Sequence, residues 1–327
     1  MGSRRVQRTG GSSYTVTLPK KWVRENDVKS RGCVDFIACD NGCLLIRAHQ
    51  DSISDLQRKT IWVDGVEGHD FLFRLLVASY ITGYDEIELK SKKRIDTVLR
   101  EAATEFTQVA VGPEIVSEKV NSLLIRDLMD PRELPSKQTI KRMRVLVQTM
   151  VEDALTSYTR SDSKLAKEVV LRDIEVDRLY WFICRRKSRR VNSFGCWDSK
   201  DDSLVFSLAT MLERIADHAV IIARNQRVLS GKIGDGLVKK IRAAGTLSTD
   251  ILYQGMDSWA EKDMRKANDA IESHNDLVNA CERILSAKGG KGVSSVPLVY
   301  VAESIRRVGE YSVNICEYVM DWLVEDF

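Results

Sequence analysis

The sequence lacks the patterns that mark most enzymes and integral membrane proteins. Its 327 residues contain no P-loop, no G-x-S-x-G motif and no glycine-rich dinucleotide fingerprint, and its four histidines show no metalloprotease spacing. No stretch approaches the roughly 18–20 consecutive apolar residues that a membrane helix needs. We therefore expect neither an enzyme nor a membrane-spanning protein.

Cysteine is sparse and unpaired in sequence. The seven cysteines form no C-x-x-C pair and lie at Cys33, Cys39, Cys43, Cys184, Cys196, Cys281 and Cys316. A disulfide framework or a thiolate zinc site is therefore not expected, and buried reduced cysteine is the simpler interpretation. The first eleven residues carry charges without a following apolar run, so we expect no secretory signal and a cytoplasmic protein.

The charge is unevenly distributed along a chain long enough for several domains. Apolar residues make up 43% and charged residues 30%, which is typical of a folded globular protein. The net charge is +3, yet residues 1–50 alone hold nine Lys or Arg against four acids, and residues 1–24 hold six cations and no acid. Such a basic module on a nearly neutral body is typical of a nucleic-acid foothold. The alternative is a frayed cationic tail.

Residues 1–50 predict a small β domain. A strand around 5–7, the turn-forming residues 10–13 and a strand over 14–18 are followed by Pro19, which favours the start of a short helix to about Asn26. Two further strands flank the turn Asp40-Asn41-Gly42 and predict a hairpin. A unit of this size is too small to bury a core alone, so we expect it to dimerise.

Residues 51–130 alternate between strand and helix patterns and predict a small α/β module with no chemical motif. The expected strands are 60–63 and 86–89, the expected helices 71–82 and 95–109, and the closing hairpin 114–126.

From residue 131 onward the pattern is helical. Six apolar-periodic runs are predicted at 137–158, 162–188, 202–229, 237–259, 261–286 and 296–325. They form two groups, 131–230 and 237–327. The segment 212–223 aligns with 305–316, and 173–177 aligns with 272–276, so the two groups are interpreted as a duplicated three-helix bundle.

Acidic residues recur one helical turn apart, which places both members of a pair on one face. The pairs are Asp173 with Asp177, Glu213 with Asp217, and Glu272 with Asp276. The first pair falls inside an apolar arc, where two like charges are costly unless a cation or protonation compensates. Oxygen-rich clusters from facing helices suit magnesium, manganese, iron or zinc. The alternative is a salt bridge from an Arg or Lys of a neighbouring helix.

The other charged positions are less specific. In the second bundle the partner positions are Arg306 and Glu310, and an arginine there should repel a cation or pair with Glu272, so a degraded site is expected. His218 follows the acidic pair but points away from Asp217, which favours a hydrogen-bonded boundary histidine. The basic run 185–190 is interpreted as favourable charge at a helix carboxyl end with a solvated turn, or as a contact for an anionic partner.

Two segments resemble known families. Residues 4–48, with TVTLPKKW, the downstream Gly32 and the terminal hairpin, resemble the AbrB/MazE (SpoVT-AbrB) swapped-hairpin DNA-binding domain. Residues 137–325, with LERIADHAVIIA and RRVGEYSVNICE, resemble the two bundles of the phosphate-uptake regulator PhoU. Together they resemble archaeal-type PhoU proteins with an N-terminal AbrB domain. Residues 51–130 resemble the region that connects the two parts in that family.

The resemblance implies a multidomain α+β protein: a swapped-hairpin β domain, an α/β connecting module and two tandem three-helix bundles. It implies a homodimer that binds DNA through Arg4, Arg5, Arg8, Lys20, Lys21 and Arg24. It also implies divalent or trivalent metal on E/DxxxD motifs, which this chain matches at Asp173, Asp177, Glu213 and Asp217, and by half a site at Glu272 and Asp276, with Glu310 in doubt because of Arg306.

The expected role is a transcriptional regulator that represses phosphate uptake in response to phosphate. The alternative is an adaptor that does not bind DNA and contacts a phosphate transporter or its sensor kinase. A metal-dependent hydrolase is disfavoured because no general base stands out.

Overall fold

The structure is a computed structural model that describes residues 3–38, 42–49, 56–129, 135–194, 200–226, 233–286 and 295–324. The chain divides into two units, one formed mainly by the residues up to Asp55 and the other by most of the remainder. Cys39, Cys196 and the turn residues Asp40 and Asn41 lie outside the described residues, as do residues 231–232 of the predicted break at 231–236 and the whole of the break at 289–292.

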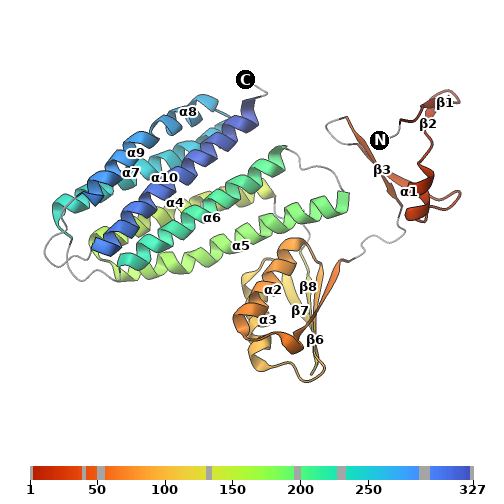
Figure 1. Ribbon diagram of the computed structural model, residues 1–327, viewed down its shortest axis with the longest axis horizontal. Coiled ribbons are helices and arrows are strands. Elements are labelled where there is room, and N and C mark those ends of the chain that lie inside the picture. The colour runs from red at the N-terminus through yellow and green to blue at the C-terminus, as the bar shows by residue number, and fades with distance from the viewer. Residues whose placement is uncertain are drawn as a thin grey trace. The chain divides into compact units, whose positions relative to one another are not determined.

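The first unit consists of two hairpins around a short helix (Figure 1). Strand β1 (Gln7–Thr9) pairs antiparallel with β2 (Ser13–Thr15), and β3 (Val34–Ala38) with β4 (Leu44–Ala48). Between them lies α1 (Lys20–Glu25), which begins directly after Pro19. The predicted hairpin β3–β4 and the helix are therefore confirmed, with the helix one residue shorter at each end. The strands predicted over 5–7 and 14–18 are found at 7–9 and 13–15.

No side chain of the first unit is buried among its described residues. Several large apolar side chains are more than two-fifths exposed: Val6, Tyr14, Val16, Phe36 and Leu44. The described residues of a single copy of this unit thus form no buried core, as expected for so short a chain segment.

Residues 58–127 form a four-stranded sheet with two helices. The elements are β5 (Arg58–Trp62), the 3₁₀ turn η1 (Val63–Gly65), α2 (His69–Thr82), β6 (Glu86–Lys90), α3 (Thr97–Val109), β7 (Pro113–Glu118) and β8 (Ser122–Asp127). The strand order is β5-β6-β8-β7, in which β5 and β6 are parallel and the other pairs antiparallel. Because strand residues alternate between faces, Ile87 and Leu89 meet Leu76 and Phe106 of the helices in one core.

Seven helices follow: α4 (Ser136–Arg160), α5 (Ser163–Phe194), α6 (Lys200–Gln226), α7 (Asp235–Glu261), α8 (Met264–Glu272), α9 (His274–Leu285) and α10 (Ser295–Leu323). Asp162 caps α5 by accepting from the backbone N–H groups of Lys164 and Leu165, both at 3.0 Å. Asp263 caps α8 in the same way. The single helix predicted over 261–286 is instead two, which meet at Ser273.

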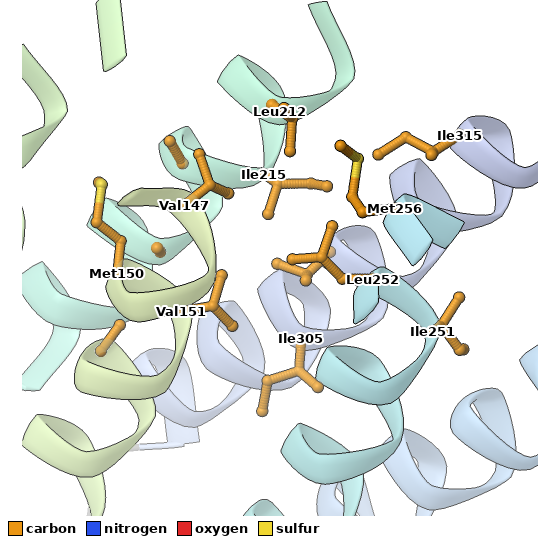
Figure 2. Close-up of a cluster of buried hydrophobic side chains, with 14 of the residues drawn as sticks. Val147, Met150, Val151, Leu212, Ile215, Ile251, Leu252, Met256, Ile305 and Ile315 are labelled. Carbon is orange, nitrogen blue, oxygen red and sulfur yellow. The ribbon is translucent and has the colours of Figure 1, made fainter. Parts of the chain in front are cut away.

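The two groups of helices share one hydrophobic core. Figure 2 shows Val147 and Val151 of α4, Ile215 of α6, Leu252 of α7 and Ile305 of α10 pointing toward one another, and all are essentially buried. Helices α4, α6, α7 and α10 run side by side at the centre (Figure 1). The bundles are therefore packed against each other rather than separate bodies.

Cys33, Cys184, Cys281 and Cys316 carry free thiols. Cys184, Cys281 and Cys316 are buried, as expected, and burial raises their thiol pKa values, to about 11 for Cys184. Cys33 and Cys43 are exposed, so the expectation of burial is wrong for these two, because they lie in the unit that has no core.

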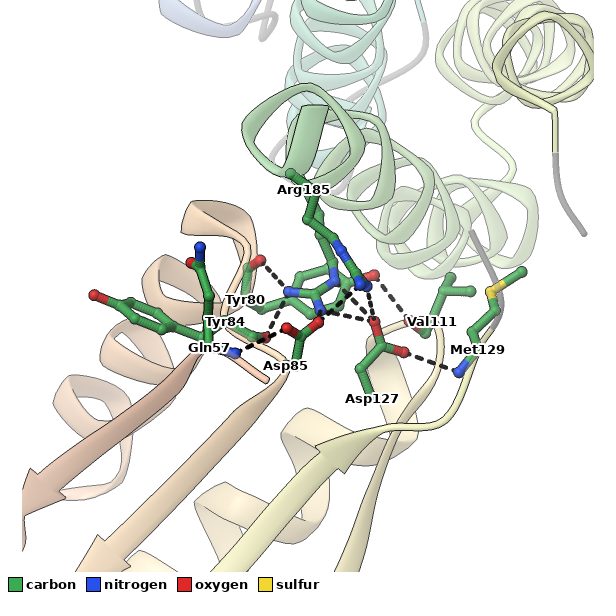
Figure 3. Close-up of polar contacts among 9 residues, drawn as sticks. Gln57, Tyr80, Tyr84, Asp85, Val111, Asp127, Met129 and Arg185 are labelled. Carbon is green, nitrogen blue, oxygen red and sulfur yellow. Dashed lines mark hydrogen bonds and ion pairs between the residues drawn. The ribbon is translucent and has the colours of Figure 1, made fainter. Parts of the chain in front are cut away.

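A buried arginine joins the α/β module to the helical body (Figure 3). Arg185 of α5 is 2% exposed, and its guanidinium donates to Asp127 Oδ2 from Nε at 2.9 Å and to the backbone oxygens of Tyr80 and Tyr84 from Nη1 at 2.9 and 2.7 Å. Arg189, one turn on, lies 2.9 Å from Asp85. The interpretation of 185–190 as a helix end with a solvated turn is therefore wrong, since α5 continues to Phe194 and Arg185 is enclosed by the module.

We predict that Arg185→Met lowers the free energy of unfolding by about 3 kcal/mol, because the buried Asp127 loses its close partner and keeps only Arg189, at 3.5 Å. The matched control is Arg142→Met, which breaks the exposed Arg142–Glu175 pair and should cost less than about 1 kcal/mol. Urea unfolding followed by circular dichroism measures both. Equal shifts in the two variants would contradict a structural role for the joint.

Candidate functional site

Two helices bring four carboxylates together. The antiparallel helices α5 and α6 place Asp173 and Asp177 within electrostatic reach of Glu213 and Asp217. All four side chains are half-buried rather than open to solvent. The Glu213 side chain is 18% exposed and that of Asp217 48% exposed, so the cluster runs from the bundle interior to its surface. The i, i+4 spacing on each helix is what aligns them.

Asp173, Asp177 and Glu213 have raised pKa values. Burial, together with the charges of Asp173, Glu213 and Asp217, raises the pKa of Asp177 to about 7. Burial and the charge of Asp217 raise the pKa of Asp173 above its usual range, and the same two causes raise the pKa of Glu213. The negative form of this group is therefore costly in the folded protein.

Counter-charge at the cluster is weak. Arg214, on the same helix as the second pair, lies 3.6 Å from Glu213 and 3.7 Å from Asp217 and is itself more than half exposed. Within the described ranges, Asp173 and Asp177 form no ion pair. The neighbouring-helix arginine considered from the sequence therefore does not neutralise the first pair.

Other shielded carboxylates of the second unit are neutralised by arginine. Glu86, 1% exposed, receives bonds from Arg58 and Arg126, and Asp127 pairs with Arg185. Asp173 and Asp177 differ from these because no arginine forms an ion pair with them among the described residues, although the charge of Arg224 on α6 acts on Asp173 and lowers its pKa in part. In the part of the chain that the structure describes, however, no three His, Cys, Asp or Glu side chains lie close enough to hold a metal ion. A cation would require the carboxylates to approach more closely than they do.

The second acidic group is arranged differently. Glu272 ends α8 and Asp276 lies in the first turn of α9, on opposite sides of the break at Ser273, and both are exposed. Arg306 pairs with Glu310 and, from Nη2, with Glu303 Oε1 at 2.6 Å. We expected Arg306 either to repel a cation or to pair with Glu272. Instead it pairs with Glu303 and Glu310, two acids of its own helix.

His218 lies between the two groups of helices. Its Nδ1 is 3.3 Å from Ser304 Oγ, and its ring lies 5.8 Å from that of Tyr311. Burial lowers the pKa of its imidazole. The prediction of a hydrogen-bonded boundary histidine is confirmed.

The six predicted DNA-contacting residues are all exposed: Arg4, Arg5, Arg8, Lys20, Lys21 and Arg24. They precede β1, lie within it or belong to α1. Lys21 forms a loose pair with Glu25 at 3.7 Å, and Arg8 donates to the backbone oxygen of Gly11. Their charges are therefore largely available to an anionic partner.

Tyr180 is a neighbour of the cluster that sequence reasoning missed. It lies one turn beyond Asp177, and its phenol is within electrostatic reach of Glu213 and Cys184. Burial raises the pKa of its phenol to about 12, so it stays protonated and can donate a hydrogen bond. The i+3 spacing from Asp177 could have indicated this position, because residues three apart lie on the same face of a helix.

Comparison with known proteins places the helical body in context. Residues 140–226, which span most of α4 together with α5 and α6, match the family model described as the PhoU domain. The match includes all four clustered carboxylates. The chain is 23% identical to a phosphate-specific transport system accessory protein PhoU homolog of Clostridium acetobutylicum, over 58% of this chain and 90% of that protein. It is 24% identical to phosphate-specific transport system accessory protein PhoU of Escherichia coli, over 57% of this chain and 82% of that protein.

Two solved structures that resemble this chain are also of proteins named PhoU. The crystal structure of PhoU from Pseudomonas aeruginosa superposes with a TM-score of 0.48 at 20% identity, covering 58% of this chain and 96% of that one. The crystal structure of the phosphate transport system regulatory protein PhoU from Streptococcus pneumoniae superposes with a TM-score of 0.49 at 16% identity, covering 58% of this chain and 94% of that one. Among the described helices, none is long and apolar enough to cross a membrane.

We predict that Asp177→Asn changes the pH dependence of stability. Because the pKa of Asp177 is higher in the folded protein than its ordinary value of 3.8, the folded state binds this proton more tightly. The free energy of unfolding of the wild type should therefore fall as pH rises from about 4 to about 7. The variant should flatten this fall and be more stable than wild type above pH 7, in denaturant titrations with chelator present.

The control is Glu168→Gln, at an exposed position on the same helix. It should leave the pH profile as in the wild type. A profile of Asp177→Asn that superposes on the wild type would show that the carboxylates do not repel one another in the folded protein.

Proposed function

We propose that this protein is a regulatory accessory protein of phosphate uptake that acts by contact with a phosphate transporter or its sensor kinase. The observation that carries the proposal is the PhoU domain match over α4–α6, supported by relatives whose names describe phosphate-transport accessory proteins. The shared core of the helical body makes it a rigid surface for such a contact. The role is regulatory, without a catalytic step.

The proposed sensor site is the cluster of Asp173, Asp177, Glu213 and Asp217. Its acids are half-buried, repel one another and have only the exposed Arg214 and Arg224 as counter-charge, and a bound cation would remove that cost. Carboxylate oxygens suit iron, manganese, zinc or magnesium. A metal bound there would supply fixed positive charge and draw α5 and α6 together.

The second group is proposed not to bind metal. Glu272 and Asp276 lie on separate helices in the open, and Glu310 already shares the positive charge of Arg306. A cation at this position would compete with a covalently fixed guanidinium. One site per chain is therefore proposed.

We predict that Mn²⁺ binds the full chain with a stoichiometry of one site or one small cluster, and that Asp177→Asn with Glu213→Gln abolishes the heat of binding in calorimetry. The control, Glu272→Gln with Asp276→Asn, removes the same charge and should bind as the wild type. If the control loses binding and the first variant keeps it, the site has been assigned to the wrong bundle.

A second candidate function is DNA binding by the first unit, through an AbrB-like swapped-hairpin homodimer. Two observations favour it. The six cations of residues 4–24 are exposed, and the unit exposes apolar side chains that strand exchange with a second copy would cover. As a transcriptional regulator the protein would then act on phosphate-uptake genes instead of, or beside, the transporter.

One triple variant separates the two candidates: Arg5→Ala, Arg8→Ala, Lys21→Ala. If DNA is the target, gel shifts on a fragment upstream of the host's phosphate-transporter genes should weaken. The slope of log affinity against log salt should also fall by roughly 3, because each phosphate contact contributes about 0.9. Regulation of phosphate uptake in cells should be lost as well.

If contact with the transporter or kinase is the mechanism, the same variant should retain normal uptake regulation in a deletion strain. The control is Lys141→Ala, Lys164→Ala, Lys167→Ala, three exposed cations of the helical body. A loss of uptake control by the first triple variant, with the control intact, would overturn the contact mechanism.

A further inference from the structure

The α/β module has one end fixed and one end free of the helical body. The joint with α5 involves Tyr84 and Asp85, which precede β6, and Asp127, which ends β8 (Figure 3). The opposite end of the same strands carries the loop 91–95 after β6 and the turn 119–121 before β8. Since each strand is five or six residues long, these loops lie a full strand length from the joint.

The loops at the free end are held in place by hydrogen bonds. Ser91 N–H donates to the backbone oxygen of Asn121 at 2.9 Å, and Ile95 N–H to that of Val120 at 3.0 Å. The carboxylate of Asp64 accepts from Ser91 Oγ at 2.9 Å and from the backbone N–H of Lys92 at 3.0 Å. These bonds fix the backbone, so the exposed side chains project from a preformed surface.

That surface is basic. Its cations follow β6 and sit in the adjoining turn: Lys92, Lys93, Arg94 and Lys119. All four are exposed, and none forms an ion pair within the described residues. Three acids lie beside these four cations: Asp64, which holds the loop, Asp96, which caps α3, and Glu67; Glu118 is paired with Arg100. The cations therefore outnumber the acids at this end by one. Charge complementarity thus calls for an anionic partner.

Apolar side chains stand among these cations. Trp62 is 59% exposed, Val120 at the turn tip 65% and Val98 in the first turn of α3 43%. Trp62 is the strand neighbour of Lys90, which in turn neighbours Ser122, so the indole lies at this end of the sheet. Aliphatic tips gain nothing from a nucleic-acid backbone but gain from the boundary between lipid headgroups and acyl chains, where tryptophan is also favoured.

We propose that this distal surface (Trp62, Lys92, Lys93, Arg94, Val98, Lys119 and Val120) docks peripherally on an anionic lipid membrane. The cations contact lipid phosphates, while Trp62 and the two valines enter the headgroup region. None of the residues of this surface belongs to the helical body, and the inference is independent of the proposed regulatory function.

The test is co-sedimentation of the full chain with vesicles of phosphatidylcholine alone or mixed with phosphatidylglycerol. Wild type should bind only the mixed vesicles, and less at high salt. Lys92→Ala with Lys93→Ala and Arg94→Ala should weaken binding on the order of a hundredfold. The matched control is the Lys141, Lys164, Lys167 triple alanine variant, which should bind as wild type.

A second readout follows Trp62 directly. Brominated lipid should quench part of the protein's tryptophan fluorescence in the wild type, and Trp62→Phe should remove that part. The surface assignment is overturned if the Arg5, Arg8, Lys21 variant loses vesicle binding while the 92–94 variant keeps it. It is also overturned if the 92–94 variant loses affinity for single-stranded nucleic acid but not for vesicles.

Discussion

The guanidinium of Arg185 is the interaction on which the second unit depends most. It is almost fully buried, and it is tolerated because Asp127 and two backbone oxygens of the module surround it. Removing water from such a charge is costly unless every donor is used, and here the acceptors are fixed by the end of one strand and the start of another. A single helix thereby belongs to two cores: Trp181 packs edge-on against Phe73 of the module, while Val176 and Leu179 face the bundle.

The two halves of the helical body show how one substitution changes the chemistry of a duplicated position. In the first half Glu213 and Asp217 leave negative charge next to Asp173 and Asp177, which Arg214 and the more distant Arg224 offset only in part. In the second half Arg306 stands where the first half has Glu213, and it is neutralised by Glu303 and Glu310. The acids of the first half are thus only partly neutralised, whereas the charges of the second half neutralise one another.

Much of this organisation follows from local sequence signals. The i, i+4 acids, the apolar periods of the long helices and the proline and glycine signals around the hairpins predict elements because they act over a few residues. The break at Ser273 escaped because no proline or glycine marks it. The role of Arg185 escaped for another reason: its partners lie 58 to 105 residues earlier, and nothing in a run of cations says which one will be enclosed. The free basic end of the module was missed because it depends on a strand pairing that brings 91–95 beside 119–121.

The spacing of Asp177 and Arg185 on α5 has a mechanical consequence. Eight residues of helix separate them by about 12 Å along the axis and by roughly a quarter turn around it. A rotation of α5 about its axis that moves Asp177 toward α6 would also move Arg185 away from Asp127 and from the backbone oxygens that accept its hydrogen bonds. The helix is therefore pinned against rotation, and the gap between the acids can narrow only by side-chain reorientation or by displacement of α6.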